Sequence, residues 1–240
     1  MNVYIIGAGG GGSWLLPSMA MLVGKENVII MDRDTLERSN LNRQLFTSED
    51  IGKNKARALG EKYDCRFIEG FYSYGCMGHD SEDWIISCAD NHPCRKAILD
   101  ACDDYGCKAL IAANEKTSAE GYFYRKGWKG GPLDPRVYYP DILTDQSDDP
   151  TRPESCTGEA QQRTPQLVTA NIMAISLVNW LFVLWHIKMP TMDRRVVEPL
   201  SPHHLRANMT RLETFIIGDT LNDYHRSNAE RGATSVTAAA

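Results

Sequence analysis

The sequence lacks an excess of positive charge: its 240 residues carry 26 Lys and Arg against 31 Asp and Glu, a formal net charge of −5. This balance argues against a protein that binds nucleic acid by neutralising phosphates. The bias typical of disordered, collagen-like or coiled-coil chains is also missing, since 42% of the residues are hydrophobic and 24% are charged. The length suits one domain with a sizeable core.

No two of the seven cysteines form a C-x-x-C pair, so the paired motifs of a structural zinc site are missing. An odd number of irregularly spaced cysteines favours reduced thiols in a cytoplasmic protein over a disulfide framework. Met1 leads directly into an apolar strand pattern, without the basic segment and cleavage site of a signal peptide. Internal repeats are also missing.

Charge is absent from one long segment between Arg163 and Lys188, and residues 167–187 of this segment are strongly apolar. That length could span a bilayer. However, Asn171 and Asn179 interrupt it, and no basic cluster flanks it to set a topology. We therefore expect a buried core helix and no membrane partner, because helices that are apolar all round also occur in soluble cores.

The first half of the chain alternates short apolar runs with helical patterns. Continuous apolar runs are typical of strands that are buried on both faces of a parallel sheet. The alternation predicts an α/β fold with a doubly wound, mostly parallel sheet. The expected strands are 3–7, 27–31, 66–72, 83–88 and 108–113, and the expected helices are 14–22, 53–63 and 93–103.

The second half changes character after an expected strand at 120–126. Residues 127–166 form an irregular stretch with six prolines, and a loop of this length in a compact chain is usually functional or mobile. The apolar helix follows, with further strand candidates near 195–197 and 214–217. We expect one domain over residues 1–226 and a flexible tail over 227–240, which has little to bury.

A glycine-rich segment, Gly7 to Gly12, satisfies the pattern G-x-G-x-x-G through Gly7, Gly9 and Gly12. It follows an expected strand and opens an expected helix, the context in which the pattern indicates a nucleotide site. Glycines let the backbone approach phosphate oxygens, and the helix N-terminus supplies amide donors. Asp32, at the end of the second strand, is suited to bind ribose hydroxyls. These features do not distinguish NAD from ATP.

Further motifs follow in order: D-R-D at 32–34, S-N-L-N-R-Q at 39–44, G-K-N-K-A at 52–56 and C-A-D-N at 88–91. Over about residues 3–95 the chain resembles the ThiF/MoeB family and the adenylation domain of ubiquitin-activating enzymes. The resemblance implies a Rossmann-like sheet with an antiparallel C-terminal extension, and binding of ATP with Mg²⁺. It also implies adenylation of the C-terminal glycine carboxylate of a small ubiquitin-like or sulfur-carrier protein.

The chemistry agrees with this resemblance, because adenylation moves negative charge onto the α-phosphate and the departing pyrophosphate. Arg43 can bind a phosphate through two parallel hydrogen bonds, and Lys55 can act on phosphate as a positive point charge. Asp90, at the end of a strand, could hold Mg²⁺. The expected nucleotide site therefore comprises Gly7, Gly9, Gly10, Gly12, Asp32, Asp34, Asn40, Arg43, Gln44, Lys55, Asp90 and Asn91.

Each of these residues also has a structural interpretation when taken alone. Arg43 or Lys55 would then be a solvated surface charge, and Asp90 with Asn91 would cap the helix that begins near residue 93. Arg95 suits a phosphate contact and an ordinary helix charge equally well. The joint appearance of the motifs favours the site.

Cys156 differs from the other six cysteines because it lies in the long polar loop, in the segment E-S-C-T. Ubiquitin-activating enzymes have a similar Cys-Thr pair before a proline and a helix, although Pro165 here stands at an unusual spacing. A thiolate at Cys156 could attack the acyl-adenylate and form a thioester. The acidic loop would raise its pKa, so an ordinary loop cysteine is the alternative.

The resemblance further implies a homodimer and a downstream conjugating enzyme or sulfur donor as partners. Acidic residues between 141 and 159 favour a carrier with a basic face. Two features depart from the family: the first strand begins at Val3, where many members have a preceding helix with an arginine for the partner's ATP, and the zinc motifs are missing. An NAD-dependent oxidoreductase and a non-catalytic carrier-binding module are the alternative functions.

Overall fold

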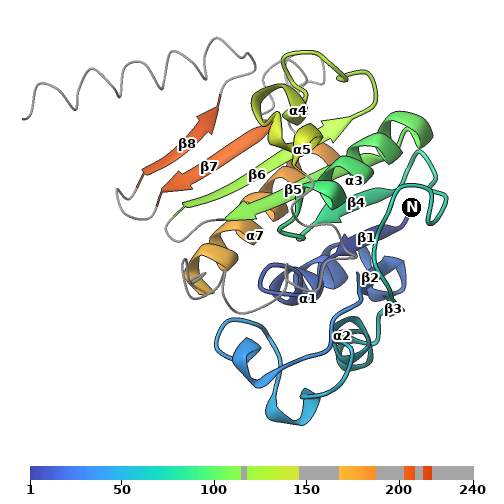
Figure 1. The fold of residues 1–240 in the computed structure, drawn as a ribbon, viewed down its shortest axis with the longest axis vertical. Helices are drawn as coiled ribbons and strands as arrows, with labels where there is room; N and C mark the ends of the chain where they lie inside the picture. Colours follow the sequence, from blue (N-terminus) through green and yellow to red (C-terminus); the bar gives the residue numbers. More distant parts are fainter. Residues whose placement is uncertain (115–117, 146–167, 188–202, 209–212, 218–240) are drawn as a thin grey trace, which may run out of the picture.

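The computed structural model describes residues 1–114, 118–145, 168–187, 203–208 and 213–217. Across these ranges the strands form one eight-stranded sheet in the order β3-β2-β1-β4-β5-β6-β7-β8 (Figure 1). The first five strands in this order are parallel, and the last three are antiparallel. The strands are β1 (Val3–Ile6), β2 (Val28–Asp32), β3 (Arg66–Glu69), β4 (Trp84–Ser87), β5 (Lys108–Asn114), β6 (Ser118–Arg125), β7 (His204–Asn208) and β8 (Glu213–Ile217).

This topology confirms the expected α/β class, a mostly parallel sheet with an antiparallel C-terminal extension. Helices cover both faces of the sheet (Figure 1). The helices on one face are α1 (Gly12–Val23), α2 (Lys55–Tyr63) and α7 (Val168–Phe182), and those on the other are α3 (His92–Tyr105), α4 (Pro135–Tyr138) and α5 (Asp141–Thr144). Shorter turns lie at η1 (Lys25–Asn27), η2 (Arg38–Asn40), η3 (Ser48–Asp50) and η4 (Val183–Ile187).

Successive residues of the central strands enter opposite cores, because side chains alternate across a sheet. On β4, Trp84 and Ile86 belong to the core that α1, α2 and α7 share, whereas Ile85 belongs to the core under α3. All four residues of β4 are buried. Burial on both faces explains the continuous apolar runs in the sequence.

Helix α7 packs against β5 and β6, as expected of a core helix. Residues Val168–His186 are long and apolar enough to cross a membrane, with a mean hydropathy of 1.7, and 44% of this stretch is buried. Gly121 on β6 permits the close approach, since a Cβ there would lie 3.2 Å from the Cβ of Leu177. The outer side of α7 exposes Ile172 and Trp180.

Some expectations from the sequence need correction, and others lie outside the described ranges. The stretch 127–166 is not irregular throughout, because Asp134 caps a short helix that begins at Pro135, and α5 follows it. The expected strand at 66–72 ends at residue 69, and β7 was not expected. The strand candidate at 195–197 and the expected tail at 227–240 lie outside the described residues.

A buried arginine ties the start of this segment to the rest of the fold. The Arg136 guanidinium lies 2.9 Å from Asp134 and 3.0 Å from each of Asp100 and Asp103 on α3. It also donates to the hydroxyl of Tyr124 on β6. The network links α4 to α3 and to the sheet, and it satisfies the donors of a charge that would be costly to bury alone.

Replacing Arg136 by Met should destabilise the protein by about 3–5 kcal/mol, because the buried carboxylate of Asp134 would lose its counter-charge. Urea denaturation followed by circular dichroism measures this loss. Lys129→Met is the matched control: Lys129 is exposed and pairs with Asp103 at 3.3 Å, so its removal should cost less than about 1 kcal/mol. Equal effects of the two substitutions would contradict a structural role for the network.

Candidate nucleotide-binding site

The glycine loop lies between β1 and α1, at the edge of the sheet where the parallel strands end. Gly7 has a φ of +96°, and a Cβ there would lie 3.0 Å from the carbonyl carbon of Cys88. At Gly12 a Cβ would lie 1.8 Å from the oxygen of Gly7. The chain's own packing therefore requires glycine at both positions. Among the residues that the structure describes, a Cβ at Gly9 would meet only Gln44 Nε2, at 3.8 Å, so these residues leave space above the loop.

Asp32 joins this loop to the end of β2. One carboxylate oxygen accepts a hydrogen bond from the Ala8 amide at 2.6 Å, and the other accepts one from the Asp34 amide at 2.8 Å. Burial, together with the neighbouring Asp34 carboxylate, raises the pKa of Asp32. Each carboxylate oxygen can accept more than one hydrogen bond, so the carboxylate retains capacity for a ribose hydroxyl.

The D-R-D and G-K-N-K-A motifs interlock beside this carboxylate. Lys55 is nearly buried at the start of α2, and its Nζ lies 3.1 Å from a carboxylate oxygen of Asp34. The Asn54 amide donates to the main-chain oxygen of Asp32 at 3.0 Å, while its oxygen caps α2 by accepting from the Arg57 amide. Asn54 was not among the site residues expected from the sequence, although its position directly before the helix is the signal of a capping residue.

The S-N-L-N-R-Q motif is fastened to α1. The indole of Trp14 donates to the Arg43 main-chain oxygen at 3.1 Å, and the buried hydroxyl of Ser13 accepts from the Leu45 amide at 3.1 Å. Asn40 is buried, and its oxygen accepts from the Glu37 amide at 3.0 Å. Asn40 therefore shapes the turn that presents the arginine.

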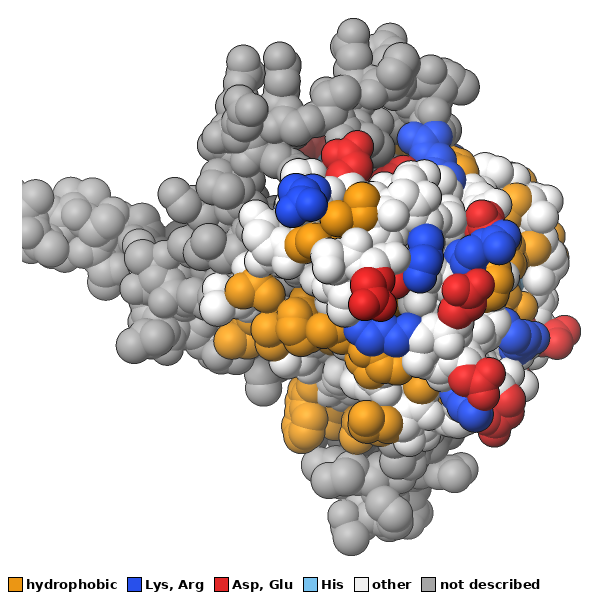
Figure 2. Space-filling view, turned by 90° about the horizontal axis from the view of Figure 1, so that it is seen from below, with side chains coloured by type: hydrophobic (Ala, Val, Ile, Leu, Met, Phe, Trp, Pro, Cys, Tyr) orange, Lys and Arg blue, Asp and Glu red, His pale blue; other side chains and the backbone are white. Residues whose placement is uncertain are grey.

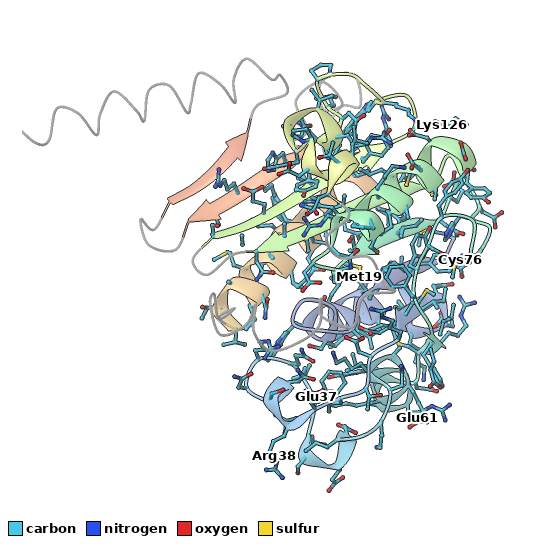
Figure 3. All side chains as sticks on the ribbon, viewed as in Figure 1. Met19, Glu37, Arg38, Glu61, Cys76 and Lys126 are labelled. Carbon is cyan, nitrogen blue, oxygen red and sulfur yellow. The ribbon has the colours of Figure 1, made fainter. Side chains whose placement is uncertain are left out.

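Arg43 lies half-buried at this edge, with its guanidinium donating to the oxygens of Ser39 and Asn42 at 3.1 Å each. Partial burial lowers the pKa of Arg43, while the charge of Asp90 acts in the opposite direction. These two residues, far apart in the sequence, therefore lie close enough to interact. Glu37 and Arg38 lie in the same connecting segment, below α1 in the view of Figure 3.

At the end of β4, Asp90 is exposed and Asn91 is the N-cap of α3, with its oxygen accepting from the Cys94 amide at 2.8 Å. The capping interpretation therefore holds for Asn91. The Nε of Arg95 is buried without a hydrogen-bond partner among the residues that the structure covers. Because Asp90 is exposed, its carboxylate faces solvent, as a ligand for Mg²⁺ would need to.

Two carboxamides flank the middle of the loop. A Cβ at Gly10 would lie 2.4 Å from Nδ2 of Asn171, a residue of α7. On the side of Gly9, Gln44 is buried and its Oε1 has no partner within the described ranges. Sequence analysis included Gln44 but treated Asn171 only as an interruption of an apolar helix. No local pattern could have connected residue 171 to the loop.

The described thiols are poorly suited to nucleophilic chemistry, apart from the exposed Cys76. Burial raises the pKa of Cys88 and of Cys94 to about 12. A thiol with so high a pKa carries almost no thiolate at neutral pH. Cys156 lies outside the described residues.

Residues 1–64 match the model of the ThiF family. The predicted resemblance to this family is confirmed. The NEDD8-activating enzyme E1 catalytic subunit of Saccharomyces cerevisiae is 44% identical over 67 residues, which cover 28% of this chain and 22% of that protein. Ubiquitin-like modifier-activating enzyme 5 of Culex quinquefasciatus is 28% identical over 142 residues, covering 50% of this chain and 36% of that protein.

The chain thus spans between about a fifth and just over a third of the length of these two relatives. A crystal structure of Escherichia coli MccB with MccA-N7isoASN has a similar fold, with a TM-score of 0.62. The similarity covers 89% of this chain and 62% of that chain at 17% sequence identity. It supports the Rossmann-like arrangement beyond the segment that the family model matches.

If the loop binds ATP, as the resemblance implies, replacing Gly9 by Ala should weaken ATP binding by about tenfold or more while leaving the melting temperature nearly unchanged, because no described residue lies in the space that the added methyl group enters. Isothermal titration calorimetry and differential scanning fluorimetry measure the two quantities. The control is Gly78→Ala at an exposed glycine with no atom within 4 Å of the added carbon. A Gly9→Ala protein with normal ATP affinity would place the phosphates away from this loop.

Proposed function

We propose that this chain uses ATP and Mg²⁺ to adenylate the C-terminal glycine carboxylate of a small ubiquitin-like or sulfur-carrier protein. The observation that carries the proposal is that residues of four separate motifs, Asp34, Arg43, Lys55 and Asp90, lie at the edge of the sheet that holds the glycine loop. Lys55 pairs with Asp34 at 3.1 Å, Trp14 of α1 binds the backbone at Arg43, and the charge of Asp90 acts on the pKa of Arg43. A dinucleotide site for hydride transfer would leave this arrangement without a role.

The protein donors suit a triphosphate. The N-terminus of α1 offers amide groups and a favourable dipole for a phosphate. Asp34 uses one of the three Nζ donors of Lys55, so two can point to phosphate oxygens. One terminal nitrogen of Arg43 is occupied by Ser39 and Asn42, so the other guanidinium donors are available.

In the proposed reaction a carboxylate oxygen of the carrier attacks the α-phosphorus of ATP, and the bond from that phosphorus to the bridging oxygen breaks. Pyrophosphate leaves, and an acyl-adenylate forms. Arg43 and Lys55 stabilise the charge that develops on the phosphates. Asp90 would hold Mg²⁺, which neutralises phosphate charge when bound. Asp32 orients the ribose.

Cys156 would then attack the acyl carbon and release AMP, giving a thioester and dividing one difficult transfer into two steps. A conjugating enzyme or a sulfur donor would receive the acyl group from there.

We further propose that the chain acts as a homodimer. Apolar side chains exposed on the adjacent helices α1 and α7 support this, namely Met21, Leu22, Ile172 and Trp180. Hydrophobic side chains also gather on the face seen in Figure 2.

ATP–pyrophosphate exchange tests the adenylation step. Exchange should appear only with a carrier that ends in Gly-Gly, and Arg43→Ala should reduce it by about 10²–10³-fold, because a donor to the developing charge is lost. Arg38→Ala, an exposed arginine of the same segment, is the matched control and should leave exchange unchanged.

The same assay separates the alternatives. Tight binding of ATP and carrier without exchange would indicate a binding module that does not catalyse adenylation. Binding of NAD without binding of ATP would overturn the proposal in favour of an oxidoreductase.

Replacing Cys156 by Ala should abolish any carrier adduct that thiols cleave, while ATP–pyrophosphate exchange continues, because exchange needs only the adenylation step. Non-reducing electrophoresis with and without a thiol detects the adduct. Cys76→Ala, at an exposed cysteine, is the control. Loss of exchange in the Cys156→Ala protein would refute the proposed division of steps.

A further inference from the structure

Asn171 is a buried carboxamide whose polar atoms are both unsatisfied. Its side chain is 1% exposed, and neither Oδ1 nor Nδ2 has a hydrogen-bond partner in the part of the chain that the structure describes. Asn179, two turns later on α7, exchanges hydrogen bonds with the hydroxyl of Ser18 at 3.0 and 3.2 Å. Burying an amide without partners is costly, so Asn171 calls for a partner that binds to the protein.

The position of this amide identifies where the partner binds. The carboxamide lies over Gly10, because a Cβ at Gly10 would lie 2.4 Å from Nδ2 and 3.1 Å from Oδ1. The next residue, Gly11, is the N-cap of α1, a helix of 12 residues. Its cap has no side-chain hydrogen bond. The amides of Ser13 and Trp14 already donate to the main-chain oxygens of Gly9 and Gly11, whereas within the described ranges the amides of Gly10, Gly11 and Gly12 make no backbone hydrogen bond. The unpaired carboxamide therefore lies beside an anion-binding helix terminus.

We propose that Asn171 is a nucleotide ligand, donating from Nδ2 to a phosphate oxygen held at the N-terminus of α1. The inference rests on the proposed function and adds to it a contact from the C-terminal part of the chain. A nucleotide offers partners for both amide atoms, because its phosphate oxygens accept hydrogen bonds and its ribose hydroxyls donate them. Helix α7 then forms part of the nucleotide site as well as part of the core.

A purely structural role accounts less well for this side chain. Leucine has a similar size and would fill the same space between α7 and the glycine loop without unpaired polar atoms. The amide thus lowers the stability of the free protein, which is common where a group is kept for binding. Asn171→Leu should for this reason raise stability and lower affinity together, a combination that a packing role does not produce.

The test compares Asn171→Leu with Asn179→Leu in the full chain, using differential scanning fluorimetry and titration calorimetry with ATP. Asn171→Leu should melt at a higher temperature than wild type and bind ATP about tenfold more weakly or worse, as expected for loss of a hydrogen bond to a charged group. Asn179→Leu should melt at a lower temperature, because Ser18 loses its partner, and should bind ATP as wild type does. ATP affinity of Asn171→Leu within twofold of wild type would overturn the proposal.

A second variant and a second ligand complete the design. If Asn171→Leu does not fold, Asn171→Ala, which removes the amide without adding bulk, is judged by the same ATP-affinity criterion. If wild type binds NAD but not ATP, the proposed adenylation fails. The role of Asn171 is then tested by comparing the NAD affinity of the Asn171→Leu protein with that of wild type, because both nucleotides present phosphates to α1. Wild-type protein that binds neither nucleotide would overturn both proposals, whereas normal carrier-dependent exchange and ATP affinity in Asn171→Leu would overturn only the role of Asn171.

Discussion

The partly buried carboxylate of Asp32 holds the glycine loop against the end of β2, and the geometry of the site depends on this contact. Its two oxygens accept the amides of Ala8 and Asp34, so one side chain sets the loop and the start of the next segment at once. Burial beside Asp34 raises the pKa of Asp32, which means that the ionised form is held at some cost in free energy. Lys55 offsets part of this cost.

The segment between β2 and α2 is bound to the glycine loop through Asp32 and to α1 through Ser13 and Trp14. Anchors to α1 at Ser13 and Trp14 fix the backbone around Arg43, so its guanidinium reaches the region of Asp90. Preorganised donors of this kind are effective because little reorganisation is needed when charge develops on a phosphate. The antiparallel half of the sheet extends from the site on the side of β5, held to α3 and α4 by Arg136.

Local patterns predicted much of the parallel half. The expected strands at 3–7, 27–31, 83–88 and 108–113 each lie within two residues of β1, β2, β4 and β5, because strands buried on both faces must be continuously apolar. Patterns were less informative where structure depends on partners. Strand β7 is defined by its pairing with β6 and β8 on either side, which no local pattern shows. Helices α4 and α5 have four residues each, too few for a clear helical period in the sequence.

The sequence by itself determined the α/β class, the glycine loop and the ordered motifs from Asp32 to Asn91, because these depend on residues that are close together in the chain. Only the tertiary structure decided what each polar group contacts. Asn91 caps α3, Asp34 pairs with Lys55, and Asn171 meets Gly10 across 161 residues of chain. The sequence around a polar side chain is the same whether that side chain is solvated, caps a helix or binds a ligand. The difference lies in burial and in the distance to its partner, which arise when distant segments pack together.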